Sequence, residues 1–211
     1  MYSQSVFIML FWGSDFNEVV LVKNKEGQRC TESGDILKRM GWGAPGGKVE
    51  KGESLYDAAI RELEEETSLK KEQVELFPEV LAQIRKDSHT KSLLLGMVLN
   101  RKALLRKDTE EISKIRRFSL KALPGGSGQI YKDHLELFQQ ARRKLVEYKY
   151  PVPIIAVDEK VDLEACLKGK DGDEKQNERQ RHPFRKNQRS WQKSWQNSLK
   201  EPIKTYTYQE G

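Results

Sequence analysis

Two short apolar runs near the N-terminus predict a pair of strands. Residues 6–12 are apolar throughout, and residues 19–22 read Val-Val-Leu-Val, with the turn-rich sequence Gly-Ser-Asp-Phe-Asn between them. Apolar runs of this length on either side of glycine and asparagine are typical of a β-hairpin. Residues 24–40 are polar, and we expect them to form a loop. Further strands are predicted at residues 80–85, 93–99 and 112–119.

An amphipathic helix is predicted behind Ser54. Glu62, Glu65 and Glu66 lie within a sector of roughly 100° on one side of this helix. Three crowded carboxylates raise one another's pKa unless a cation lies between them, and clustered carboxylate oxygens suit Mg²⁺ or Mn²⁺. An acidic run is also commonly a solvent-exposed face of a helix. The flanking residues therefore have to distinguish a metal site from such a face. The stripe expected to face the core consists of Tyr56, Ile60, Leu63 and Thr67.

A second helix is predicted over residues 129–148, where Leu135, Phe138, Ala141 and Leu145 fall on one side. Prolines follow directly and interrupt the helical pattern. We therefore expect one domain over residues 1–149 and a C-terminal extension over residues 150–211.

The spacing of the charged residues around the acidic helix indicates its function more specifically than the charge of the helix does. Residues 47–69 read GKVEKGESLYDAAIRELEEETSL. This segment resembles the Nudix box of MutT-like hydrolases, G-x5-E-x7-R-E-U-x-E-E-x-G-U, in which U is a bulky apolar residue. Ser68 stands where the family has glycine, at the end of the helix. A serine in the left-handed conformation costs about 1 kcal/mol, unless the helix ends differently.

The resemblance implies an α/β fold, the Nudix α/β/α sandwich with a mixed sheet, and a hydrolase that acts on the diphosphate of a nucleoside diphosphate-X compound. It also implies a metal cofactor, Mg²⁺ or Mn²⁺, bound by the Gly46 carbonyl, Glu62, Glu65 and Glu66. A pair between Glu53 and Arg61 is expected to brace the loop against the helix.

The resemblance leaves the general base open between Glu62 and a carboxylate outside the box, Glu110 or Glu111. Residues 42–47 form a turn-rich approach to the box, and Trp42, Gly47 and Lys48 are expected to bind the substrate. His89, between two predicted strands, could approach the same cleft.

The substrate has to be inferred from missing signatures. Family members that act on ADP-ribose tend to carry a proline about fifteen residues past the box, where this chain has Ile84. Members that act on dinucleoside polyphosphates tend to carry a tyrosine nearby, and none lies between Tyr56 and Tyr131. By elimination, we expect a nucleoside triphosphate, cleaved to the monophosphate and pyrophosphate. The alternative is that the protein is not an enzyme but a module that binds and senses nucleotides without turnover.

Charge is concentrated in the C-terminal extension. Residues 168–200 hold ten Lys and Arg against four Asp and Glu, and the whole chain has a net charge of +6, so the remainder is close to neutral. Trp191, Trp195 and Leu199 recur at helical spacing between basic residues. This pattern favours either a helix that covers an apolar patch of its own domain or a surface for RNA, which would make the enzyme a hydrolase of RNA 5′ ends (cap or triphosphate).

The chain has no apolar run long enough to span a membrane, and none that resembles a signal peptide. Cys30 and Cys166 lack metal-ligand spacing and are expected to be free thiols. We therefore expect a cytoplasmic protein without membrane partners.

Overall fold

The strand β1 (Ser3–Phe11) organises the main sheet because both of its faces are covered. It pairs in parallel with β8 (His89–Val98) and antiparallel with β2 (Glu18–Asn24) and β6 (Gly46–Lys48). All of its residues from Ser5 to Phe11 are buried. A strand that is covered on both faces needs apolar residues at every position rather than at alternate ones, which explains the continuous run in the sequence.

The computed structural model describes residues 3–25, 27–31, 34–38, 41–106, 111–125 and 129–158, with only the backbone described for residues 27–31 and 34–38. The predictions for Glu110, Cys166 and the basic segment at 168–200 lie outside the described residues, as does that for the Cys30 side chain.

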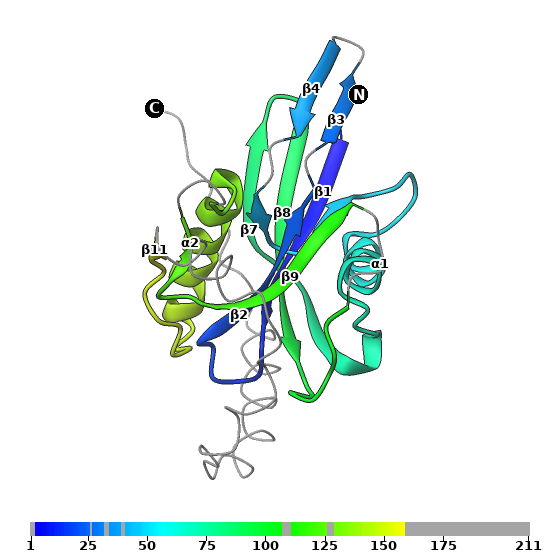
Figure 1. The fold of residues 1–211 in the computed structure, drawn as a ribbon. Coiled ribbons are helices and arrows are strands. Elements are labelled where there is room, and N and C mark those ends of the chain that lie inside the picture. Colours follow the sequence, from blue (N-terminus) through cyan, green and yellow to red (C-terminus); the bar gives the residue numbers. More distant parts are fainter. Residues whose placement is uncertain are drawn as a thin grey trace, which may run out of the picture. The chain divides into compact units, whose positions relative to one another are not determined.

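The main sheet is mixed and lies between the two α-helices. Its strand order is β5-β2-β1-β8-β7, with β6 paired to β1 and β9 paired to β2. Figure 1 shows α1 (Leu55–Thr67) and α2 (Lys132–Glu147) on opposite sides of this sheet. The predicted α/β/α sandwich with a mixed sheet is confirmed. The remaining elements of this layer are β5 (Trp42–Gly43), β7 (Val74–Lys86), β9 (Ile112–Ser119) and the short 3-10 helix η1 (Lys71–Gln73).

The prediction of a loop over residues 24–40 is wrong in part. The strands β3 (Gly27–Thr31) and β4 (Gly34–Lys38) form an antiparallel hairpin in a separate two-stranded sheet. Backbone hydrogen bonds alone define this ladder. Because the hairpin is not part of the main sheet, it does not need the apolar alternation by which a sequence reveals a strand.

The helix α1 packs on β1 and β6 through small residues. Ala58, Ala59, Leu63 and Thr67 are its buried residues, and they face the apolar side of β1 that includes Ile8. Two positions of the predicted stripe, Leu63 and Thr67, are therefore buried. The other two, Tyr56 and Ile60, are only partly buried, because the paired alanines carry the closest approach to the sheet and the larger side chains flank it.

The helix α2 packs on β7 and β8. Phe138, Ala141 and Leu145 are fully buried as predicted, whereas Leu135 is only partly buried. His134 and Leu137 are buried in addition. No described helix combines the length and the apolar character that crossing a membrane requires.

Residues 150–158 pack against the domain that contains the main sheet. The Tyr150 ring contacts Phe16 at a centroid distance of 5.3 Å, and Val152 is buried. The strand β11 (Val157–Asp158) then pairs in parallel with β10 (Leu123–Pro124).

Ser68 ends α1 in the left-handed conformation, with φ 56° and ψ 17°. Its backbone N–H donates to the Glu64 carbonyl at 2.9 Å, and its hydroxyl donates to the Arg106 carbonyl at 3.0 Å. The serine therefore keeps the helix end of the family pattern, and its hydroxyl bond offsets part of the backbone cost.

Two substitutions at Ser68 separate these contributions. Ser68→Gly removes the strain and the hydroxyl bond together, so we expect a change in the free energy of unfolding of less than about 1 kcal/mol. Ser68→Ala keeps the strain and loses the bond, so its free energy of unfolding should be about 1 kcal/mol lower than that of Ser68→Gly. Urea unfolding of both variants measures this difference. Equal stability of the two would mean that the backbone conformation is not strained.

Candidate active site

A glycine pair fastens the loop before α1 to the central strand. Gly46 and Gly47 lie in β6, opposite Phe7 and Val6 of β1. Gly46 has a φ of +139°, and a Cβ at this position would collide with the backbone carbonyl of Val6. A Cβ on Gly47 would collide with the carboxylate of Glu62. Gly46 is therefore required by its backbone conformation and by the adjacent strand, whereas a side chain at position 47 would displace the Glu62 carboxylate.

Two carboxylates of α1 border this glycine pair. Glu66 accepts a hydrogen bond from the Gly46 N–H, with 2.8 Å between nitrogen and oxygen. Glu62 lies against Gly47, and its side chain is 13% exposed. One turn of helix thus brings both side chains to adjacent residues of the loop, as the resemblance to the Nudix box implies.

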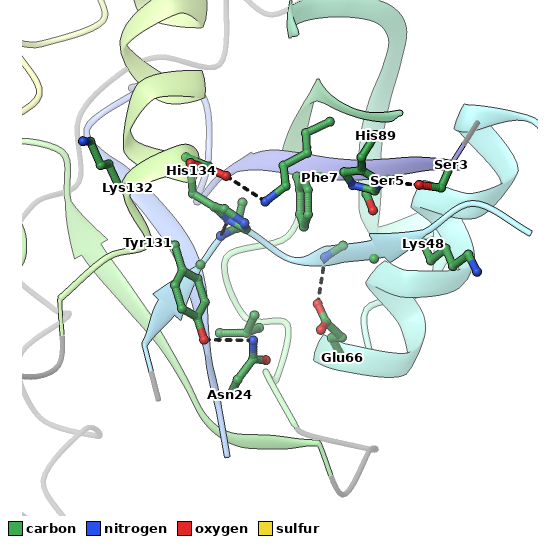
Figure 2. A pocket seen from close by; sticks show the side chains of 17 residues that line it. Ser3, Ser5, Phe7, Asn24, Lys48, Glu66, His89, Tyr131, Lys132 and His134 are labelled. Atoms are coloured by element: carbon green, nitrogen blue, oxygen red, sulfur yellow. Dashed lines mark hydrogen bonds and ion pairs between the residues drawn. The ribbon is translucent and has the colours of Figure 1, made fainter. Parts of the chain in front are cut away.

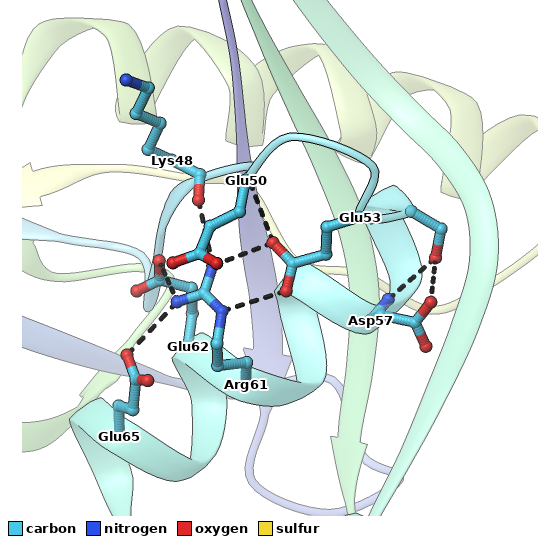
Figure 3. Close-up of polar contacts among 8 residues, drawn as sticks. Lys48, Glu50, Glu53, Asp57, Arg61, Glu62 and Glu65 are labelled. Carbon is cyan, nitrogen blue, oxygen red and sulfur yellow. Dashed lines mark hydrogen bonds and ion pairs between the residues drawn. The ribbon is translucent and has the colours of Figure 1, made fainter.

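Arg61 connects the acidic residues to one another (Figure 3). Its guanidinium binds both carboxylate oxygens of Glu53, at 3.0 and 3.1 Å. The same group donates to Glu62 at 2.9 Å, to Glu65 at 3.3 Å and to the Lys48 carbonyl at 3.0 Å. The pair between Glu53 and Arg61 therefore braces the loop against the helix.

The electrostatics of this network follow its burial. Burial raises the pKa of Glu62, against the lowering effect of the Arg61 guanidinium. The hydrogen bond from Arg61 lowers the pKa of Glu53, and the same bond raises the pKa of Arg61. Arg61 is the cation of this network, which contains four carboxylates when Glu66 is included. The region therefore keeps an excess of negative charge.

The donor set fits a divalent cation. Among the described residues, no three acidic, histidine or cysteine side chains converge as they would around a metal ion. Arg61 contacts Glu62 and Glu65, whereas Glu66 is turned toward the Gly46 N–H. The oxygens are nevertheless hard ligands held on one rigid helix beside a glycine loop. A divalent ion would offset the cost of keeping the Glu62 carboxylate charged while it is buried.

A pocket of about 720 Å³ opens beside this network (Figure 2). Gly46, Gly47, Lys48 and Glu66 line one part of it, and residues from β1, β2, β8 and the start of α2 line the rest. Pockets for small molecules and cofactors usually measure about 300–1,000 Å³. The pocket has the size of a nucleotide site and includes the loop that carries the acidic network.

His134 is a buried histidine in the wall of this pocket. It is 7% exposed, and its Nδ1 accepts a hydrogen bond from the Ala44 N–H at 2.9 Å. Burial lowers the pKa of His134 to about 3, so the ring is neutral at physiological pH. With Nδ1 acting as an acceptor, the ring proton is on Nε2.

The residues predicted from the sequence occupy different places. Lys48 and Gly47 line the pocket, and so does His89, which accepts or donates in a 2.7 Å hydrogen bond with the Ser3 hydroxyl. Trp42 is 1% exposed, packs edge-on against Phe118 and is not among the residues that line the pocket. Glu111 is exposed in the turn before β9 and is likewise not among them.

Tyr131 and His134 are among the pocket residues that were not predicted from the sequence. The signal for His134 was present, because His134, Phe138, Ala141 and Leu145 recur at i, i+4, i+7 and i+11. All four are buried. The predicted stripe had Leu135 in place of His134 as its first member, and its other three members were correct. Tyr131 precedes the helix and has no periodic signal.

The buried neutral His134 makes stability depend on pH. Its folded pKa of about 3 lies below the ordinary value of 6.5, so the unfolded chain binds a proton that the folded chain does not. Stability is therefore lost as the pH falls below about 6.5, by about 2 kcal/mol between pH 7 and pH 5. His134→Asn retains an acceptor for the Ala44 N–H and cannot titrate. Urea unfolding at both pH values should show this loss in the wild type and not in the variant; equal losses would contradict the assignment.

Comparisons with known proteins agree with this geometry. The sequence model of the NUDIX domain matches residues 1–141, which is more than half of the chain. Among curated proteins, no sequence matches. A solved MutT/nudix family protein from Enterococcus faecalis is similar in structure, with a TM-score of 0.53 and 20% identity over 70% of this chain and 63% of that chain. This chain thus spans less than two thirds of that protein's length.

Two further solved structures have lower TM-scores. An ADP-ribose pyrophosphatase from Streptococcus suis has a TM-score of 0.49 and 18% identity, over 74% of this chain and 98% of that chain. An Ap4A hydrolase from C. elegans has a TM-score of 0.47 and 16% identity, over 70% and 97% of the two chains. The domain match and the geometry of the box together identify the chain as a member of the Nudix family.

Proposed function

We propose that this chain is a metal-dependent nucleotide pyrophosphohydrolase that acts on a nucleoside diphosphate-X compound, with a nucleoside triphosphate as the favoured substrate. The observation that supports it best is the position of Glu62 and Glu66 against Gly46 and Gly47 at the edge of a pocket of nucleotide size. The preference for a triphosphate rests on the sequence, which lacks the signatures of other substrates. Mg²⁺ is the expected ion and Mn²⁺ the alternative, since both prefer carboxylate oxygens.

The metal would be held by Glu62, Glu65, Glu66 and the Gly46 carbonyl. When bound, the ion polarises the diphosphate and lowers the pKa of the attacking water. Arg61 binds the carboxylates of Glu62 and Glu65, and Glu53 holds the Arg61 guanidinium in place.

The hydrolysis itself requires one proton transfer. The water oxygen attacks one phosphorus atom of the diphosphate, and the bond from that phosphorus to the bridging oxygen breaks in line with the attack. A carboxylate accepts the water proton while the leaving phosphate departs with the bridging oxygen. Glu62 and Glu111 are the candidate bases among the described residues. Lys48, which borders the acidic residues in the pocket, offsets charge on the substrate phosphates.

The decisive measurement is turnover of a substrate panel by the wild type and Glu66→Gln. The panel contains nucleoside triphosphates, ADP-ribose, dinucleoside polyphosphates, nucleotide sugars and capped RNA, each with and without Mg²⁺. We expect release of pyrophosphate from a triphosphate, and a loss of about 100-fold or more in Glu66→Gln because a ligand is removed.

Glu64→Gln is the matched control, because Glu64 is exposed on the same helix and is not among the residues that line the pocket. This variant should keep wild-type turnover. Glu111→Gln in the same assay distinguishes the candidate bases, since a loss comparable to that of Glu66→Gln would assign the base to Glu111. Nucleotide binding without turnover of any compound would instead identify a sensing module and overturn the proposal.

Gly47→Ala tests the close approach of Glu62 to the loop. The added Cβ collides with the carboxylate and displaces it, and a displacement of about 1 Å at a catalytic group can cost about 100-fold in turnover. Gly52→Ala is the control, since a Cβ at Gly52 meets no atom within 4 Å even though its φ of +86° makes the change strained. We expect Gly52→Ala to lose stability and keep turnover, and Gly47→Ala to lose turnover. Equal turnover in both would contradict a positioning role for Gly47.

A further inference from the structure

The part of the pocket away from the acidic helix has an aromatic wall. The Phe7 and His134 rings lie 4.3 Å apart between centroids, and the His134 and Tyr131 rings lie 5.5 Å apart. All three residues line the pocket. In Figure 2, Tyr131 and His134 lie on the side of the pocket opposite Lys48.

Two glycines make room for this wall. A Cβ on Gly41 would lie 2.7 Å from the Tyr131 ring, and a Cβ on Gly43 would lie 2.9 Å from the His134 ring. The glycines before the Nudix box therefore do more than shape the loop at Gly46 and Gly47. They also allow two rings at the start of α2 to pack against the backbone.

Tyr131 is held in a defined position at the pocket. The Asn24 side-chain amide donates to its hydroxyl at 3.3 Å, and the phenol is half-buried. Burial raises the pKa of Tyr131, so the phenol is neutral. A ring that is fixed by its hydroxyl and lines a pocket is suited to stack on another planar group.

His134 adds a hydrogen-bond donor of fixed polarity. Because Nδ1 accepts from the Ala44 N–H, the Nε2–H is the donor. Within the described part of the chain, no acceptor for this N–H is found, and Nε2 is not sealed from solvent. The donor therefore serves the pocket. An uncharged N–H can donate to a carbonyl oxygen or a ring nitrogen of a nucleobase.

Lysines lie near this wall, and one carboxylate binds two of them. Lys91 lies 5.9 Å from the Phe7 ring centroid, and its ammonium is paired with Asp133 at 3.0 Å. Asp133 also binds Lys86 at 2.8 Å, so it compensates only one of these two charges, and Lys132 lines the pocket as well. We assign the diphosphate to the glycine loop because Glu62 and Glu66 of the Nudix box border that loop.

We propose that Tyr131, His134 and Asn24 form the nucleobase subsite of this enzyme, in which the base stacks on the Tyr131 ring and accepts a hydrogen bond from Nε2–H of His134. The inference rests on the proposed function for the orientation of the substrate, with the diphosphate at Gly46 and Glu66 and the base at the aromatic wall. Selectivity for a base over a bare sugar phosphate would then come from this wall.

The test is equilibrium binding to the full-length protein by calorimetry, without divalent ions. The probes are the 5′-monophosphates of adenosine, guanosine, cytidine and uridine, with ribose 5-phosphate as the probe that lacks a base. We expect at least one nucleotide to bind about 10-fold or more tightly than ribose 5-phosphate. Tyr131→Leu should reduce this margin about 10-fold, and His134→Asn about 3- to 10-fold.

Three further variants make the result specific. Tyr131→Phe keeps the ring and should keep most of the margin. Tyr148→Leu, at an exposed tyrosine that ends the same helix, should keep all of it. If Tyr131→Leu does not fold, as judged by its thermal unfolding, Asn24→Ala replaces it, with an expected loss of about 3-fold because the ring loses its hydrogen bond.

Three outcomes would overturn the subsite. These are no nucleotide binding better than ribose 5-phosphate, a margin unchanged in the Tyr131 and His134 variants, and an equal loss for ribose 5-phosphate, which would make the wall a sugar or phosphate site. Turnover that depends on Glu66 without these effects would leave the hydrolase standing and reject the subsite. Base-dependent binding without turnover would support the subsite and reject the hydrolase.

Discussion

The guanidinium of Arg61 is the contact on which the site depends, because it joins elements that would otherwise repel one another. Glu53 lies in the loop before the helix, whereas Glu62 and Glu65 lie on the helix itself, and all three bind the same group. The bond to the Lys48 carbonyl adds the glycine loop to this network. A lysine could replace the charge but not the fork of donors that reaches three carboxylates and a carbonyl at once. Glu66 lies next to the glycine loop, where its carboxylate accepts a hydrogen bond from the Gly46 N–H.

The central strand gives the site its two chemical environments. Alternate residues of β1 point to opposite faces of the sheet, so Val6 and Ile8 pack under the acidic helix while Phe7 lies in the pocket wall beside His134. The strand β6, which contains the glycine pair, pairs with Ser5, Val6 and Phe7 of β1. One strand therefore fixes the distance between the acidic network and the aromatic wall. Neither part can shift along the sheet without breaking the register of the other.

The geometry of the acidic helix was predictable because the motif itself encodes local structure. Helical periodicity places Glu62 and Glu66 on one side. The close packing of Gly46 against Val6 of β1 was not predictable in this way, because it depends on the pairing of distant strands. The aromatic wall was not predictable in this way. Tyr131 meets Asn24 across 107 positions of sequence, and Ala44 meets His134 across 90. The β3–β4 hairpin was missed for the opposite reason, since it lies apart from the main sheet and needs no apolar pattern.

The pocket has the acidic network beside one part of its wall and a neutral histidine at another, and different contacts determine the two. The Arg61 guanidinium counteracts the rise that burial causes in the pKa of Glu62, and the loop N–H of Gly46 binds Glu66. His134 stays neutral because it is buried and its Nδ1 is already occupied by a backbone donor. In the proposed subsite, the hydrogen bond from Ala44 therefore has a second consequence besides stabilising the fold, because it fixes Nε2 of His134 as the donor that faces the pocket.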